Sequence, residues 1–236
     1  MKKSILFMAG LGLAAVMTAF LFAGCISDEG TKAGDEKWTG DVDDFLRGCC
    51  GGVGIPVEYD TVTDPRDNKR YKTVKISGQR WMAENLNFET PDSSWCYNNA
   101  DSNCVKYGRL YTLNAAMEAC PAGWRLPYNN EWASLITMAG GSYKAGDKLK
   151  STSGWASYYY NSNNTNGKDT YGFSALPGGY RGSGSFSSVG SYGYWWEGGQ
   201  DGSYGYWSMS NTGSSVSENN YGNKSNGYSA RCVTDD

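Results

Sequence analysis

Cysteine is the residue type in this chain best suited to covalent chemistry. The 236-residue sequence contains seven cysteines and no histidine. Without histidine, the chain lacks the usual general base near neutral pH, the imidazole metal ligand, and any serine–histidine or cysteine–histidine nucleophile. We therefore predict that the protein is not an enzyme, and we expect no catalytic residues, no metal site and no cofactor.

Cys25 is predicted to carry a lipid. Lys2 and Lys3 precede an apolar run from Ile5 to Ala23, and the Ala-Gly-Cys sequence that follows resembles a bacterial lipoprotein cleavage site. A retained transmembrane helix is the alternative, because the run approaches the roughly 20 residues that cross a bilayer. We expect residues 1–24 to be a signal peptide, with the protein lipid-anchored at the outer membrane or cell surface.

Four of the remaining cysteines are predicted to form structural disulfides. Cys96 and Cys104 flank a turn-rich segment that can bring them within bonding distance, so we pair them. Cys120 and Cys232 are candidates for a long-range bridge, which would constrain the unfolded chain strongly. Sequence alone does not select among the possible pairings of six cysteines.

Residues 25–58 are predicted to be a hydrophilic, acidic and Gly-rich tether. Asp41, Asp43 and Asp44 lack the spacing and closing Glu of an EF-hand, so we expect a solvated turn there. For the adjacent cysteines Cys49 and Cys50 three states are open: pairing between chains, remaining reduced, or being redox-labile. Two neighbouring thiols without a CxxC motif or histidine are a poor ligand set for zinc.

The C-terminal segment, from about Tyr171, consists mainly of Tyr, Trp, Ser, Gly and Asn. Tyr and Trp supply rigid contact area while Ser, Gly and Asn supply adaptable hydrogen bonds, a mixture typical of recognition surfaces. There is too little aliphatic mass nearby to bury every tyrosine, Tyr228 included. The candidate ligand-binding residues are Tyr192, Tyr204, Tyr206, Asn211, Asn220, Tyr221 and Asn223.

Residues 59–236 are predicted to form one α+β domain. Alternating residues predict three antiparallel strands between Asp60 and Met82. Leu113, Ala116, Met117 and Cys120 have the spacing of a buried helical stripe, as do Trp132, Leu135, Ile136 and Ala139 in a second helix. Later strands are expected at Phe173–Leu176, Tyr194–Trp196, Tyr206–Met209, Ser214–Ser217 and Ser229–Val233. Residues 151–170 are expected to be a surface excursion.

Six ordered motifs resemble the Fibrobacter succinogenes major paralogous domain. They are Asp64–Asp67, Trp81–Leu86, Tyr107–Tyr111, Cys120–Pro127, Gly172–Gly179 and Ala230–Val233. The resemblance runs from about residue 60 to the end and extends to the superfamily of C-type lectins and formylglycine-generating enzymes. It implies a C-type-lectin-like fold with two short helices, a small twisted antiparallel sheet and long Gly/Ser/Asn-rich loops. A Cys120–Cys232 bridge matches the helix-to-last-strand disulfide of that fold.

The resemblance implies a surface lipoprotein whose lectin-like C-terminal face binds a glycan or a protein. The calcium-lectin triplets are absent, and structural bridges leave no redox-active pair for formylglycine chemistry. Some lectin-like proteins are diversified by retroelements in a C-terminal segment of this composition. Unbiased randomisation would also produce His, Leu and Pro, which are absent from residues 185–228. A structural or envelope-assembly role is the alternative. The net charge of −3 argues against nucleic acid as a partner.

Overall fold

The computed structural model describes residues 56–157, 165–199 and 202–235. The predictions for residues 1–24, Cys25, Cys49 and Cys50, and for the tether up to residue 55, lie outside the described residues. Within these ranges, no helix combines the length and the apolar character needed to span a bilayer. The described chain is a mixed α+β structure, as the sequence predicted, built on three β-sheets.

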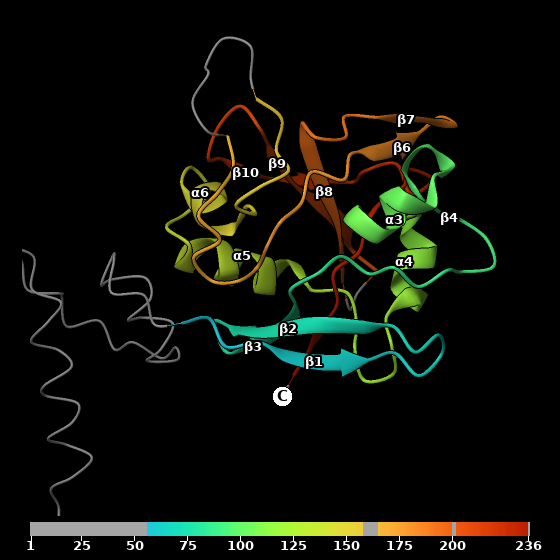
Figure 1. Ribbon diagram of the computed structural model, residues 1–236, viewed down its shortest axis with the longest axis horizontal. Coiled ribbons are helices and arrows are strands. Elements are labelled where there is room, and N and C mark those ends of the chain that lie inside the picture. The colour runs from blue at the N-terminus through green and yellow to red at the C-terminus, as the bar shows by residue number, and fades with distance from the viewer. Residues whose placement is uncertain (1–55, 158–164, 200–201, 236) are drawn as a thin grey trace, which may run out of the picture.

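The first sheet forms from the predicted N-terminal strands. It has the order β1-β2-β3-β12, comprising β1 (Asp60–Thr63), β2 (Arg70–Ile76), β3 (Gln79–Met82) and β12 (Val233–Thr234). Ser77 and Gly78 both have positive φ, which turns β2 directly into β3. In Figure 1 the C-terminus accordingly lies beside β1, β2 and β3.

The second sheet carries the C-terminal aromatic strands. Its order is β10-β9-β8-β11-β5-β4. The bounds are β4 (Ser94–Trp95), β5 (Leu110–Tyr111), β8 (Tyr192–Gly198), β9 (Tyr204–Ser210), β10 (Val216–Asn220) and β11 (Tyr228–Ser229). All its pairs are antiparallel except β11 with β8. The expectation of one small antiparallel sheet is therefore too simple.

A separate hairpin forms the third sheet. It pairs β6 (Tyr180–Gly182) with β7 (Ser185–Ser187) through Ser183 and Gly184, which both have positive φ. An isolated bridge between Arg181 and Gly227 holds the hairpin beside β11. Figure 1 shows β6 and β7 above α3, next to one end of β8.

Four α-helices and one 3-10 helix occur in the described ranges, where the sequence predicted two helices. The predicted pair are α4 (Leu113–Ala119) and α5 (Asn129–Met138). The others are η1 (Tyr97–Asn99), α3 (Asp101–Tyr107) and α6 (Ala145–Leu149). Met117 was expected on the buried stripe of α4, but its side chain is 53% exposed, and Ala119 is buried in its place.

Two hydrophobic clusters lie on opposite faces of the second sheet. The larger cluster packs α5 and α6 against the inward residues Trp195, Trp207 and Met209. The smaller cluster packs α4 against Trp196 and Tyr228. Strand β8 therefore contributes side chains to both clusters, which accounts for the apolar character of the consecutive residues Trp195 and Trp196.

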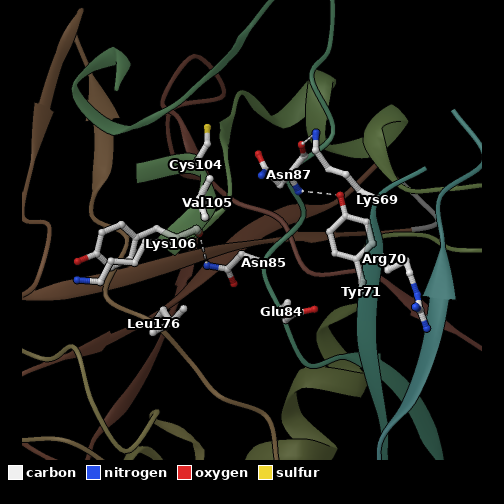
Figure 2. Close-up of a pocket in the computed structure, with 12 residues that line it drawn as sticks. Lys69, Arg70, Tyr71, Glu84, Asn85, Asn87, Cys104, Val105, Lys106 and Leu176 are labelled. Carbon is white, nitrogen blue, oxygen red and sulfur yellow. Dashed lines mark hydrogen bonds between the residues drawn. The ribbon is translucent and has the colours of Figure 1, made fainter. Parts of the chain in front are cut away.

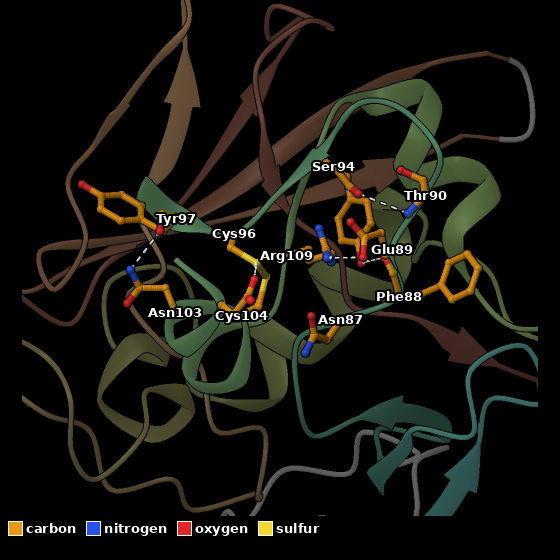
Figure 3. The surroundings of a disulfide bond; sticks show 12 residues. Asn87, Phe88, Glu89, Thr90, Ser94, Cys96, Tyr97, Asn103, Cys104 and Arg109 are labelled. Carbon is orange, nitrogen blue, oxygen red and sulfur yellow. Dashed lines mark hydrogen bonds and ion pairs between the residues drawn. A yellow bond between two sulfur atoms is a disulfide. The ribbon is translucent and has the colours of Figure 1, made fainter. Parts of the chain in front are cut away.

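Two disulfides have the expected pairing. Cys96 and Cys104, eight residues apart, join the start of η1 to α3, as Figure 3 shows. Cys120 and Cys232, 112 residues apart, join the end of α4 to the segment before β12. Tyr97, next to the first bridge, packs its ring against Phe186 of β7 at 5.3 Å. The short bridge therefore supports the β6–β7 hairpin.

Several predicted strands differ in the structure. Residues 173–176 form no strand, and only Ala175 makes an isolated bridge, to Lys150. The expected strand Ser229–Val233 is divided into β11 and β12, which belong to different sheets. The described part of the expected surface excursion is also anchored, because Trp155 is 5% exposed and its indole donates to Ala175 O at 3.0 Å.

Candidate ligand-binding surface

The candidate surface is the face of β8, β9 and β10 that points away from α5. Alternation along β8 and β9 places Gly193, Trp195, Gly205, Trp207 and Met209 on the inner, buried side. We call the opposite side the outer face. Its residues are Tyr192, Tyr194, Trp196, Tyr204, Tyr206, Ser208, Ser210, Ser217, Asn219 and Tyr221.

Aromatic rings gather at the β8 side of the outer face. We call Tyr180, Tyr192, Tyr194 and Tyr206 the tyrosine row. Tyr192 stacks on Tyr194 at 5.7 Å with an interplanar angle of 15°. Tyr194 also stacks on the buried Tyr228, with ring centroids 5.3 Å apart. Side chains in a strand stand roughly perpendicular to the sheet, so rings stacked in this way cover each other's faces and direct their edges outward.

The tyrosine row is only partly open to solvent. Burial, reinforced by the neighbouring phenols, raises the pKa of Tyr194 above its usual value. Tyr228 is 5% exposed, and burial raises its pKa to about 12. Tyr192 is the most exposed member at 37%. The raised pKa values keep the Tyr194 and Tyr228 hydroxyls protonated at neutral pH.

A second aromatic group forms where β9 begins and β10 ends. We call Tyr204, Tyr221 and Lys224 the aromatic corner. The Tyr204 and Tyr221 rings are 6.1 Å apart and perpendicular, at 90°. The Lys224 ammonium lies 4.3 Å from the centroid of the Tyr204 ring. Tyr221 is 81% exposed, so most of its ring is in contact with water.

The predicted ligand-binding residues separate into three groups. Tyr192 and Tyr206 belong to the tyrosine row, whereas Tyr204 and Tyr221 form the aromatic corner. The exposed Asn220 and Asn223 flank Tyr221, although Asn220 points to the inner side of β10 and Asn223 Oδ1 accepts a turn hydrogen bond from Ser225 N at 3.0 Å. The four tyrosines therefore lie on the outer face, whereas Asn220 points to the other side of the sheet.

Asn211 is not part of this surface, and its prediction as a ligand contact is wrong. Its residue exposure is 6%, and its Nδ2 donates to Ala156 O at 2.9 Å. The amide instead fixes the turn after β9 to the segment that follows Trp155. An asparagine that joins two loops has the same sequence context as one that faces a ligand.

Sequence reasoning missed Tyr180, Tyr194 and the polar half of the outer face. Ser208, Ser210 and Asn219 lie there, and Asn219 Nδ2 donates to Ser208 Oγ at 3.3 Å. The signal was available, since Tyr-Gly-Tyr-Trp occurs at 192–195 and again at 204–207. Its period of two places the tyrosines of both strands on one face.

A buried carboxylate supports the sheet behind the outer face. Glu197 is 4% exposed, and one of its oxygens accepts from the Trp207 indole at 2.5 Å. Asn129 Nδ2, at the start of α5, donates to Glu197 at 3.3 Å and to Glu218 at 2.9 Å. Burial is the main cause of a raised Glu197 pKa, and the nearby Glu218 adds to it.

Arg231 connects the C-terminal segment to the core. It is completely buried and donates to Asn85 Oδ1 at 2.8 Å and to the carbonyl of Phe173, over whose ring it lies. Asn85 Oδ1 also accepts from the Trp195 indole at 2.9 Å. Burial lowers the pKa of Arg231 to about 9, so the guanidinium is charged at neutral pH. This network holds the inner side of β8 in place.

Arg125 and three buried tryptophans also have structural roles. Arg125 pairs with Glu131 at 2.8 Å and with Asp235 at 2.6 Å. Trp81, Trp132 and Trp195 are fully buried, and the helical spacing had predicted this for Trp132. These side chains are occupied within the fold, and none of them faces the outer face.

A cavity of about 210 Å³ lies between β2, the segment after β3 and α3. Figure 2 shows that Arg70 and Lys106 extend away from it in opposite directions. Asn85 Nδ2 donates to Tyr107 O at 2.8 Å, and Tyr71 OH accepts from Asn87 N at 3.1 Å. Because the polar groups are already paired with each other, this cavity is a weaker candidate for ligand binding than the outer face.

Fold and surface together define a mixed α+β domain, stapled by disulfides, that presents an uncharged face of tyrosine, serine and asparagine. The family model of the Fibrobacter succinogenes major domain matches residues 74–234. The chain belongs to this family, as its motifs predicted. No curated protein and no solved structure gives a significant match.

Proposed function

We propose that the protein is a surface-displayed lipoprotein whose outer face binds a glycan or a protein. One observation carries the proposal. The strand positions of the outer face contain no charged side chain, and in β8 and β9 they alternate with buried positions of the larger cluster. Tyr194, Tyr204 and Tyr206 pack against the smaller cluster but stay partly exposed, so their rings remain available for contacts. Such a mixture is suited to contacts made through hydrogen bonds and aromatic edges.

A C-type-lectin-like architecture is part of this proposal. The bridge from the end of α4 to the segment before β12 supports it, since it joins a helix to the last strand. A role as a formylglycine-type enzyme has less support, because Cys96, Cys104, Cys120 and Cys232 are all bonded within the described domain. A free thiolate is the reactive form of cysteine.

Removing rings from both ends of the outer face tests the binding role. We expect the double variant Tyr192→Ala/Tyr204→Ala to bind its ligand at least about tenfold more weakly, because interface energy is concentrated in a few aromatic contacts. Arrays of glycans and of cell-surface proteins would be screened with the full-length protein in detergent, and the ligand found would then be titrated.

Tyr143→Ala is the matched control. Tyr143 is 84% exposed, and it lies between α5 and α6, away from the outer face. Its loss is expected to leave affinity unchanged. Equal affinity of the double variant and the wild type, with both folded, would contradict the proposal and favour a structural role in the envelope.

Display through Cys25 is tested separately. We expect Cys25→Ser to abolish lipid attachment and move the protein from the detergent phase to the aqueous phase in Triton X-114 partitioning. Metabolic labelling with a radioactive fatty acid gives an independent readout. Incorporation of label by Cys25→Ser would refute attachment at this residue.

A further inference from the structure

Tyr221 has a backbone conformation that its residue type disfavours. Its φ is +62°, in the left-handed region. Nine other non-glycine residues in the described ranges have positive φ, and all of them are Asn, Asp or Ser. These small polar residues tolerate the left-handed region because their side chains bond locally, whereas a bulky aromatic residue does not.

Folding does not account for a tyrosine at this position. The Tyr221 side chain is 81% exposed and its hydroxyl makes no hydrogen bond within the described residues. Within the described residues its ring pairs with one other aromatic ring, the perpendicular Tyr204. The next residue, Gly222, packs closely against Tyr206, since a Cβ at this position would lie 2.7 Å from the Tyr206 ring. The chain is therefore held in a strained turn that points an exposed ring outward, an arrangement that recurs at functional sites.

Tyr221 also differs from the tyrosine row in what it offers to a ligand. Within the row Tyr194 stacks on Tyr192 at 15°, and it also stacks on the buried Tyr228 at 21°, so its faces are covered. The Tyr221 ring is perpendicular to that of Tyr204, and because Tyr221 is 81% exposed, most of its ring is accessible. An accessible aromatic face can stack on a flat apolar surface of a ligand.

The polar groups beside Tyr221 are mainly neutral amides. Asn220 and the Nδ2 of Asn223 make no side-chain hydrogen bond within the described residues. Lys224 is the single cation in the corner and lies over Tyr204. Arginine, whose fork best matches a carboxylate or a phosphate, has no recorded contact with Tyr204 or Tyr221 in the described ranges.

We propose that the aromatic corner is a saccharide subsite in which Tyr221 stacks on an uncharged sugar ring. This inference rests on the proposed function. Asn223, two residues after Tyr221, has a free Nδ2 that supplies an amide hydrogen bond to the hydroxyls of the sugar. The small area of accessible aromatic face favours a single sugar ring over a protein, whose interface requires on the order of 800 Å² on each partner.

Tyr221→Gly separates a ligand contact from a structural role. Glycine adopts a positive φ without a steric penalty, so the melting temperature of the variant is expected to equal or exceed that of the wild type. Binding to neutral saccharides is expected to fall at least about tenfold. Tyr221→Phe keeps the ring and is expected to bind within about threefold of wild type.

Tyr143→Gly is the matched control, since Tyr143 is as exposed as Tyr221 but has no positive φ. It is expected to lower the melting temperature and to leave saccharide binding unchanged. The full-length protein in detergent would be run in native gels containing mannan, xyloglucan or dextran, with heparin as the acidic comparison, and screened on a glycan array of neutral and acidic saccharides.

Each outcome supports or overturns the inference. Retardation by a neutral saccharide that Tyr221→Gly alone abolishes supports it. Binding only to heparin or to a protein overturns it while leaving the proposed function intact, as does saccharide binding that Tyr221→Gly does not weaken. A large fall in melting temperature for Tyr221→Gly also overturns it. If no saccharide and no protein binds, the proposed function fails as well.

Discussion

Glu197 shows how a single residue links the candidate surface to the stability of the fold. Its carboxylate lies directly behind the outer face, bonded to Trp207 and to Asn129 at the start of α5. Burying a charge is costly unless hydrogen bonds compensate, and here the hydrogen bonds come from neutral donors. Glu218 shares the Asn129 amide and adds repulsion.

The raised pKa of Glu197 predicts that its effect on stability depends on pH. Below the unfolded pKa of about 4.5, both states hold the proton and the residue contributes no pH dependence. As pH rises from there through the folded pKa, the unfolded state releases its proton first. The folded state therefore loses stability relative to the unfolded state, and the loss is complete above the folded pKa.

Glu197→Gln removes this titration. We expect the free energy of unfolding of the variant, minus that of the wild type, to increase steadily as pH rises from about 4 to about 7. Urea unfolding followed by tryptophan fluorescence measures the difference at each pH. Gln keeps an acceptor for the Trp207 indole, so the change reports mainly on the charge.

Glu118→Gln serves as the control, because Glu118 lies exposed on α4. Its curve is expected to run parallel to that of the wild type. A difference between Glu197→Gln and wild type that stays constant across this pH range would show that burial of the Glu197 charge does not matter for the stability of the domain.

At the level of the elements, periodicity identified the helices and strands that bury a regular face. Helix α5 has buried residues Trp132, Leu135 and Ile136, whose spacing was visible in the sequence. Helix α3 buries only Cys104 and Tyr107 in seven residues, and its middle residue, Cys104, is held by a disulfide. Its polar sequence is also typical of a turn, so the local pattern could not show whether this segment is a helix or a turn.

The candidate surface was only partly predictable for a related reason. Composition located the segment that carries Tyr192, Tyr204 and Tyr221, because exposed tyrosines need no partner close in sequence. It could not show that Tyr228 is buried between two strands, or that Asn211 binds a loop at Ala156, 55 residues away. These outcomes depend on which strands become neighbours, including the parallel pairing of β11 with β8.

At the scale of the whole molecule, the two disulfides constrain very different lengths of chain. Cys120–Cys232 encloses most of the domain, including α5, α6 and strands β6–β11. Cys96–Cys104 encloses only η1 and part of α3. Loss of the long bridge therefore releases the C-terminal segment that carries Arg231 and β12 from the end of α4, whereas loss of the short bridge acts locally beside the β6–β7 hairpin.

Removing each bridge in turn tests this difference. In the loop-entropy account, the 112-residue separation stabilises the domain by about 5 kcal/mol and the eight-residue separation by about 2.5 kcal/mol. We expect Cys120→Ala/Cys232→Ala to lower the free energy of unfolding about twice as much as Cys96→Ala/Cys104→Ala, as measured by urea unfolding. Hydrogen exchange should report loss of protection in β12 and β3 for the first variant and in α3 for the second. If the short bridge proves equally costly to remove, local support of the hairpin, rather than closure of the chain, dominates the stability of this fold.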